Sequence, residues 1–327
     1  MRTAILFKVT AVLPLVSLLA CQTDSAGPSL SPSASVKFSL SAAEWSAPVN
    51  LGATINSAAG EMNAALSADE LSLYITSDRS GGFGSTDLWV ARRDCIDCPW
   101  QAPVNLGDQF NAAGQDAGPR LSNDGHLLFF QTDRGRGAGI FDLYVSRRAN
   151  PNDDFGWGPP ARLGPDVNVS DGSQQAAFYL QSAEEGGGNL YFNRATLEVP
   201  QPEIYYASIS RDGETRGPAV LVPELNVVAA NDQHITMSKD GKEIFFSSNR
   251  TGGLGGFDIY TSTRDNVNQP WSPPVGVAAL NTSFNDMQPS LSANGRTLIF
   301  TSNRDGGQGR TDIWVVTRSP GEVLTAK

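Results

Sequence analysis

The chain has 327 residues, of which 40% are hydrophobic and 18% are charged, so it can build a core and is not a disordered acidic polymer. Its 34 acidic residues exceed its 24 basic ones, which gives a formal net charge of −10. A surface this acidic repels a phosphate backbone, so the composition argues against nucleic acid as a partner. Basic peptides, cations and neutral glycans remain compatible with it.

The first twenty residues resemble an export signal. Arg2 and Lys8 precede a largely apolar run that is too short for a membrane-spanning helix. The run ends Leu-Leu-Ala-Cys at residues 18–21, which resembles the bacterial lipobox and implies that Cys21 is lipidated. Gln22 after the cysteine implies the outer membrane, so we expect a lipid-anchored envelope protein facing the periplasm. The alternative is an ordinary signal peptide that leaves Cys21 as a free thiol.

Residues 21–44 are expected to form a flexible tether. They are rich in serine, alanine and proline, and such a segment buries little apolar surface. A lipid on Cys21 followed by a tether holds the next domain near a membrane surface, so the lipid is the only expected contact with the membrane. The remaining chain divides into a repeat region, 45–318, and a tail, 319–327.

The repeat region carries one unit five times. Each copy contains a segment with proline, an asparagine, a hairpin turn between two apolar runs, and a loop with arginine that leads to a third run. The arginine-to-aspartate spacing in this loop is eight residues in four copies, and in the third copy it is nine, with glutamate as the acid. A spacing this constant indicates one supersecondary unit used five times. No segment after residue 40 shows a sustained 3.6-residue apolar period, so no helix is expected there.

Each unit predicts a four-stranded antiparallel sheet. Asp-Gly and Asn-Gly turns join the first two strands, and the segment with proline is typical of a short edge strand. Such sheets repeated radially form a propeller, so the sequence predicts an all-β, five-bladed β-propeller. The last copy ends after its third strand, near Arg318, whereas residues 45–51 supply a strand before the first copy. We therefore expect the N-terminal strand to complete the fifth blade and close the ring.

The repeat resembles a known family. Its marks are the Ser-x-Asp-Gly turns, the Phe-Phe-x-Ser strand at 245–248, the Asp/Asn-Arg loop and the Asp-Ile-Tyr/Trp strands at 258–260 and 312–314. Together they resemble the WD40-like PD40 repeat of the TolB propeller domain and of many bacterial envelope proteins. The resemblance covers residues 45–318 and implies the propeller fold. It says little about activity, because one propeller scaffold hosts many functions.

The arginine and aspartate of each glycine-rich loop are predicted to pair. An aspartate at the start of the third strand would accept two hydrogen bonds from the arginine and fix the loop. Repetition in four copies favours a structural role, since a catalytic site is usually asymmetric. A phosphate cradle is disfavoured because such glycine loops open a helix, whereas these open a strand. The predicted pairs are Arg79 with Asp87, Arg134 with Asp142, Arg250 with Asp258, and Arg304 with Asp312.

A second repeated set lies just before the inner strands. Its carboxylates and amides are expected to approach one mouth of the central channel, where they could bind a ligand or a hard cation such as Ca²⁺. The alternative is that each side chain caps its own turn through bonds to the backbone. No other cofactor is expected. The set consists of Glu61, Asp116, Asp232, Asp286, Asn56, Asn111, Asn226 and Asn281.

Three further features depart from the repeat. Cys95 and Cys98 are predicted to form a local disulfide, because an exported protein meets oxidising conditions and no further zinc ligands lie nearby. The two histidines, His126 and His234, are taken as incidental. The third copy lacks the Asp-Gly turn and the glycine loop, which indicates either drift of the repeat or a surface for a specific partner.

These observations favour a non-catalytic envelope lipoprotein. Its propeller would bind or scaffold an envelope protein, a peptide or a cell-wall glycan. Whether it is an enzyme stays open, and the sequence favours that it is not, because the acids occupy equivalent positions and none differs from the rest. No catalytic residue is assigned. The alternative is a glycan-active enzyme resembling the glycoside hydrolases, which would use two of the channel-mouth carboxylates.

Overall fold

The computed structural model describes residues 45–182 and 187–319. Contacts divide the chain into residues 1–40 and 41–327, and every described residue belongs to the second unit. The expected signal segment, Cys21 and the tether lie outside the described residues, as does the tail beyond Ser319. In the part of the chain that is described, no helix is long and apolar enough to cross a membrane.

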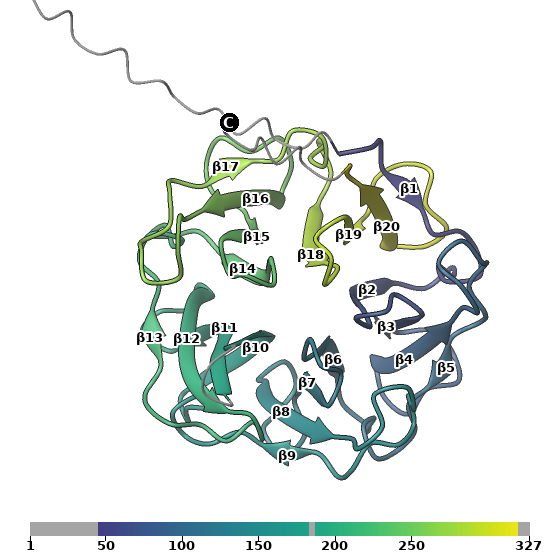
Figure 1. Ribbon diagram of the computed structural model, residues 1–327, viewed down its shortest axis with the longest axis horizontal. Helices are drawn as coiled ribbons and strands as arrows, with labels where there is room; N and C mark the ends of the chain where they lie inside the picture. Colours follow the sequence, from purple (N-terminus) through teal and green to yellow (C-terminus); the bar gives the residue numbers. More distant parts are fainter. Residues whose placement is uncertain (1–44, 183–186, 320–327) are drawn as a thin grey trace, which may run out of the picture. The chain divides into compact units, whose positions relative to one another are not determined.

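The described residues form an all-β, five-bladed propeller, which confirms the predicted fold (Figure 1). Blade 1 consists of β2 (Glu61–Leu66), β3 (Ser72–Ser77), β4 (Asp87–Arg92) and β5 (Val104–Asn105). Blade 2 consists of β6 (Asp116–Leu121), β7 (Leu127–Thr132), β8 (Asp142–Arg147) and β9 (Ala161–Arg162). Blade 3 consists of β10 (Gly172–Gln181), β11 (Gly187–Thr196), β12 (Glu203–Ser210) and β13 (Val220–Leu221). Blade 4 consists of β14 (Asp232–Met237), β15 (Glu243–Ser248), β16 (Asp258–Thr263) and β17 (Val275–Gly276).

Blade 5 joins the two ends of the repeat region. Its first three strands are β18 (Asp286–Leu291), β19 (Thr297–Ser302) and β20 (Asp312–Thr317), and its outer strand is β1 (Val49–Asn50). We call the first strand of each blade, which lies nearest the propeller axis, its inner strand (Figure 1). Val49 pairs with Val315 and Asn50 with Trp314 in antiparallel register. The N-terminal strand therefore closes the ring, as predicted. Each outer strand is two residues long, which agrees with the short edge strands predicted from the segments with proline.

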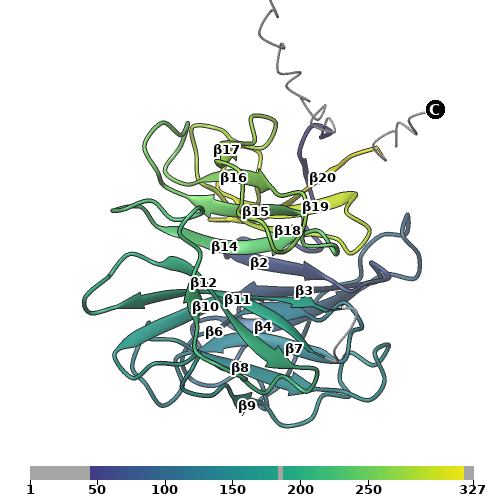
Figure 2. The same cartoon turned by 60° about the vertical axis from the view of Figure 1, so that its left-hand side comes forward.

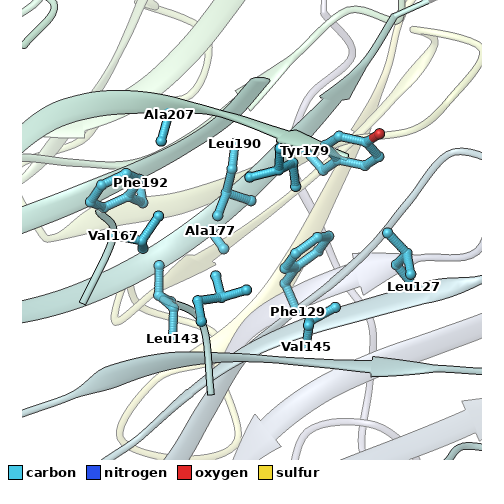
Figure 3. Packing of buried hydrophobic residues seen from close by; sticks show 12 residues of the cluster. Leu127, Phe129, Leu143, Val145, Val167, Ala177, Tyr179, Leu190, Phe192 and Ala207 are labelled. Carbon is cyan, nitrogen blue, oxygen red and sulfur yellow. The ribbon is translucent and has the colours of Figure 1, made fainter. Parts of the chain in front are cut away.

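Apolar strands are buried on both faces because neighbouring blades pack against each other, as the turned view shows (Figure 2). Consecutive residues of one strand point to opposite neighbours, so Phe129 of β7 packs toward blade 3 and Phe130 toward blade 1. Figure 3 shows the cluster between blades 2 and 3, where Phe129 and Leu143 meet Leu190 and Phe192. This two-sided burial explains why the second strands read as continuous apolar runs.

The inner strands all bulge at the same place. The bulge residue of each strand has a left-handed φ between 50° and 67°, and these residues are Asn63, Gly118, Ala176, His234 and Gln288. The register of each inner strand shifts there. In four blades the bulge N–H donates to a polar side chain on the second strand of the preceding blade, as in the 2.8 Å bond from Ala176 N to Gln131 Oε1. The bulges thus join each blade to its neighbour near the propeller axis.

Candidate functional site

The arginine of each regular blade pairs with the acid that begins the inner strand, which corrects the predicted pairing. Arg79 Nη2 lies 3.0 Å from Glu61 Oε1 in blade 1. The same pairing joins Arg134 to Asp116 at 2.9 Å, Arg250 to Asp232 at 2.6 Å, and Arg304 to Asp286. Each arginine therefore reaches the acid 18 residues before it, not the aspartate eight residues after it.

Local hydrogen bonds explain the direction of the arginine. Arg79 donates from Nε to Ser77 Oγ and from Nη2 to the carbonyl of Ile55, and both acceptors lie on the side of the inner strand. Asp87 has a different task. Its carboxylate accepts the backbone N–H groups of Phe83 at 2.7 Å and Gly84 at 3.2 Å, and so fixes the glycine-rich loop. The predicted role of Asp87 in fixing the loop is thus met, but through the backbone.

Two of the other predicted aspartate partners also bind the backbone of their loop and not the arginine. Asp258 accepts from the backbone N–H groups of Leu254 and Gly255, and Asp312 from those of Gln308 and Gly309. Asp142 differs, because Arg162 Nε donates to it at 2.7 Å. Asp142 does not pair with Arg134, because Arg134 forms its ion pair with Asp116.

Both carboxylate oxygens of each inner-strand acid accept hydrogen bonds within its own blade. Asp116 and Asp232 each accept an arginine on one oxygen and a backbone N–H on the other, from Ala112 at 2.6 Å and Val227 at 2.7 Å. Glu61 and Asp286 add serine and threonine hydroxyls to the same arrangement. Each acid is at most 1% exposed. We call each of these acid–arginine pairs, with its hydrogen bonds, an inner-strand node.

These nodes do not fit a calcium site. Ca²⁺ takes six to eight oxygen ligands, whereas each acid here already neutralises an arginine. Within the described residues no group of three or more histidine, cysteine, aspartate or glutamate side chains could hold a metal ion. The expected cation or ligand site at the acids is therefore replaced by four separate structural pairs.

The four repeated asparagines clasp the backbone of the preceding blade. Asn111 accepts from the N–H of Leu88 at 2.8 Å and donates to its carbonyl at 3.1 Å. Asn226 and Asn281 bind Ile204 and Ile259 in the same two-bond manner. Asn56 does so with Ile313, across the point where the ring closes. The amides thus bond to the backbone, as in the alternative to a ligand site, but these bonds reach the preceding blade and are not caps of their own turns.

Blade 3 lacks an inner-strand node because Gln174 stands in place of the acid. Gln174 is fully buried, and neither its amide nitrogen nor its amide oxygen has a hydrogen-bond partner in the described part of the chain. Arg194, the arginine of this blade, donates from Nη2 to the carbonyls of Asp166 and Val167, and its Nε has no partner there. Burial lowers the pKa of Arg194 below its usual value, and nearby Tyr205 and Asp171 offset only part of this effect.

Replacing Gln174 by glutamate is expected to raise the free energy of unfolding by about 1–3 kcal/mol, since a charge-assisted bond to Arg194 replaces two unsatisfied groups. The precedent is Glu61, which fills the same position in blade 1. Urea unfolding at pH 7 measures the change, with the half-buried neighbour Gln175→Glu as the matched control. An unchanged or lower unfolding free energy for Gln174→Glu would contradict this account of blade 3.

Two other predicted features lie away from these contacts. A disulfide joins Cys95 and Cys98 in the loop between β4 and β5. His126 contacts the carbonyl of Arg148 through Nδ1 at 2.9 Å, so it belongs to the packing of blade 2.

The irregular blade borders a cavity of about 540 Å³, which we call the blade-3 cavity. Strands β10 and β11 are ten residues long, against six for the first two strands of the other blades, and the hairpin they form makes one wall. Its polar and charged lining residues include Gln181, Asn189, Arg216, Lys239 and Asp240. This volume lies in the range of small-molecule sites.

Asp240 is the carboxylate that lines this cavity. Its Oδ1 accepts from Ser238 Oγ at 2.6 Å and from the N–H of Lys242 at 3.1 Å, so the side chain is held in one orientation. Its Oδ2 has no hydrogen-bond partner among the described residues. The sequence did not single out Asp240 because the same Ser-x-Asp turn occurs at Asp69 and Asp124. The only signal was the irregular third copy, whose long hairpin borders this turn.

Comparisons with known proteins place the fold but not the family. No protein-family model matches the chain, and no curated protein matches it. The PD40 resemblance therefore gains no support from a family model, and what stands of it is the five-bladed propeller.

Solved structures do resemble the propeller. A thermostable family-43 glycoside hydrolase matches with a TM-score of 0.55 and 12% identity, over 81% of this chain and 96% of its own. An endo-arabinase from Bacteroides thetaiotaomicron matches with a TM-score of 0.56 and 18% identity, over 84% of this chain and 98% of its own. TolB from Acinetobacter baumannii matches with a TM-score of 0.47 and 15% identity, over 80% of this chain and 55% of its own.

These matches correct the expected function. At such identities they show the fold alone. However, the two named structures with a TM-score above 0.5 are sugar-cleaving enzymes, and both are covered almost entirely by this propeller. The folds that the propeller resembles therefore do not support the non-catalytic scaffold that the sequence had favoured. The chemistry cannot use the inner-strand acids as first expected, because each of them is buried against an arginine.

Proposed function

We propose that the protein is a glycan-active enzyme whose sugar substrate binds in the blade-3 cavity. The observation that carries this proposal is an oriented carboxylate, Asp240, one oxygen of which has no hydrogen-bond partner among the described residues, in a cavity of about 540 Å³. Amides from Gln181 and Asn189 and cations from Arg216 and Lys239 surround it, and these groups can bind sugar hydroxyls. Support for the reaction class comes from the similar folds of the glycoside hydrolases.

Cleavage of a glycosidic bond uses two carboxyl groups in different environments. The second candidate is Asp124, which does not itself line the cavity but whose Oδ2 accepts from Nε2 of the cavity residue Gln181 at 3.1 Å. Burial alone raises the pKa of Asp124, but hydrogen bonds from Ser122, the N–H of His126 and Gln181 lower it below its ordinary value. We therefore assign Asp124 as the ionised base or nucleophile, and Asp240, through its free oxygen, as the proton donor to the leaving group.

Replacing Asp240 by asparagine is expected to lower kcat/KM for glycan hydrolysis at least about 100-fold, because the proton donor is lost while the shape is kept. The first probes are arabinan and chromogenic arabinofuranosides, since an endo-arabinase and an α-L-arabinofuranosidase share the fold. Xylo-oligosaccharides follow, because a structure of similar fold holds xylotriose.

The matched control is Asp69→Asn, which alters the equivalent exposed turn of blade 1, outside the cavity. This variant should retain the wild-type rate. Hydrolysis at the wild-type rate by the Asp240 variant would reject the assigned site. Absence of hydrolysis across the three substrate types, together with no binding by calorimetry, would reject the proposed function.

A further inference from the structure

A second cavity lies on the propeller axis, because its lining comes from all five inner strands, which surround the centre in Figure 1. The lining residues from these strands include Leu66, Arg120, Phe178, Met237 and Leu291. The hairpin turns that follow the inner strands form its rim, with Lys239 among them. We call it the axial cavity. Its volume of about 40 Å³ exceeds the space that one water molecule needs.

Arg120 is a buried cation without a carboxylate partner. Its side chain crosses from blade 2 and donates to the carbonyls of Ala64 in blade 1, at 3.3 Å, and Pro289 in blade 5, at 2.7 Å. Arg120 is 7% exposed, and no ion pair to it occurs within the described residues. Burial lowers the pKa of Arg120 to about 10, so the guanidinium stays charged at neutral pH. Of its five N–H donors, the two carbonyl bonds leave three available.

The surroundings of Arg120 offer no compensating negative charge. Lys239 brings a second cation to the rim of the axial cavity, and neither aspartate nor glutamate occurs among the lining residues. The arginines of the four inner-strand nodes, by contrast, each meet a carboxylate. An uncompensated buried charge destabilises the fold. The chain has an excess of acids, yet none of them pairs with Arg120, so we expect an anion from solution to neutralise this arginine.

His234 does not line the axial cavity, but the Arg120 cation acts on its pKa and it has an unused polar atom. It is 7% exposed, and its Nδ1 has no hydrogen-bond partner in the described part of the chain. Burial and the Arg120 cation lower the pKa of His234 to about 3, so the imidazole is neutral at pH 7 and one ring nitrogen can donate. The equivalent bulge residues Asn63 and Gln288 differ, because they bond to each other between the adjacent blades 1 and 5.

We propose that the axial cavity binds a small monovalent anion, chloride or a carboxylate group, on the guanidinium of Arg120. The anion would accept charge-assisted hydrogen bonds and neutralise the buried cation, and Lys239 would attract it to the rim. The cavity admits a group of this size but not a phosphorylated sugar or a peptide chain. This site does not depend on the proposed glycan activity, since the blade-3 cavity is lined by other groups except for Lys239.

The test follows thermal unfolding of the full chain at pH 7.5. Sodium acetate or sodium chloride replaces sodium HEPES, whose bulky sulfonate cannot enter, at constant ionic strength. The wild-type Tm should rise with the logarithm of the anion concentration above the dissociation constant, by about 3 °C at ten times that constant. The rise should be lost in Arg120→Met and kept in Arg216→Met, which removes the same charge from the other cavity. Acetate and chloride titrations distinguish a carboxylate site from a chloride site.

Histidine NMR on the wild-type protein decides the question even where Arg120→Met fails to fold. The chain has two histidines, so the ring signals of His234 and His126 separate easily, and His126 serves as the internal control. The His234 signal should move saturably with acetate or chloride while the His126 signal stays in place. Binding is overturned if the His234 signal does not move with either anion, or if Tm rises equally in wild type and in a folded Arg120→Met variant.

Discussion

Replacing Asp154 by asparagine is expected to lower the free energy of unfolding by about 3–5 kcal/mol, because it leaves a buried arginine without its partner. Asp154 is 1% exposed and lies in the loop after β8. Its carboxylate accepts from Ser72 Oγ and Tyr74 Oη of blade 1, each at 2.7 Å. It also accepts from Arg148 Nη1 at 3.2 Å, and the Arg148 side chain is 1% exposed. The loss would therefore fall on the interface between blades 1 and 2.

Urea unfolding at pH 7 measures this loss, and Asp153→Asn is the matched control because Asp153 is the exposed neighbour. The control should stay within about 0.5 kcal/mol of wild type. A loss below about 1 kcal/mol for Asp154→Asn would show that the network contributes little to the fold.

The Asp154 network also predicts a pH dependence. Burial alone raises the pKa of Asp154, but hydrogen bonds from Arg92, Ser72 and Tyr74 lower it below its ordinary value. A carboxyl whose pKa is lower in the folded state stabilises the fold above its unfolded pKa, which is about 3.9. That contribution is lost as the pH falls through the lower folded pKa. The difference in unfolding free energy between wild type and Asp154→Asn should therefore shrink on acidification below about pH 4.

The second large effect is expected at an inner-strand node. Replacing Asp286 by asparagine should cost about 3 kcal/mol of unfolding free energy, since Arg304 loses its carboxylate and its side chain is only 11% exposed. Thermal and urea unfolding measure the loss, and the exposed neighbour Asp305→Asn is the control.

A double variant separates the pair from the rest of the node. Adding Arg304→Gln to Asp286→Asn removes the unpaired cation, so the combined loss should be smaller than the sum of the two single losses. Strictly additive losses would mean that the two side chains do not stabilise the fold as a pair.

The architecture could be predicted because it depends on repetition. Five copies with constant spacing fixed the number of blades, and the leftover strand before Glu61 indicated how the ring closes. The arginine partners could not be predicted the same way. Arg79 has an acid on either side in the sequence, Glu61 and Asp87, and spacing alone favours the nearer one. The deciding contacts, from Ser77 Oγ and the carbonyl of Ile55, exist only once the blade has folded.

The candidate sites were harder to predict for a related reason. A repeat draws attention to residues that recur, whereas the two cavities depend on residues that differ between blades. Arg120 occupies the place of Ser290 in blade 5 and Ala65 in blade 1 by its distance from the inner-strand acid. His234 was taken as incidental although its Nδ1 is buried and unpartnered. A comparison of the five copies for charge, position by position, would have found Arg120.

Ring closure determines the order in which the strands can pair during synthesis. Asn50 belongs to the first strand of the propeller to leave the ribosome, yet Asp312, to which its side chain donates at 2.8 Å, is made 262 residues later. Asn56 likewise can accept the N–H of Ile313 only after that residue has been synthesised. During synthesis the four middle outer strands can pair at once with a neighbour in their own hairpin, whereas β1 cannot. A nascent chain stopped before β20 therefore has an unsealed ring, and its earliest strand remains without a partner until the last one is complete.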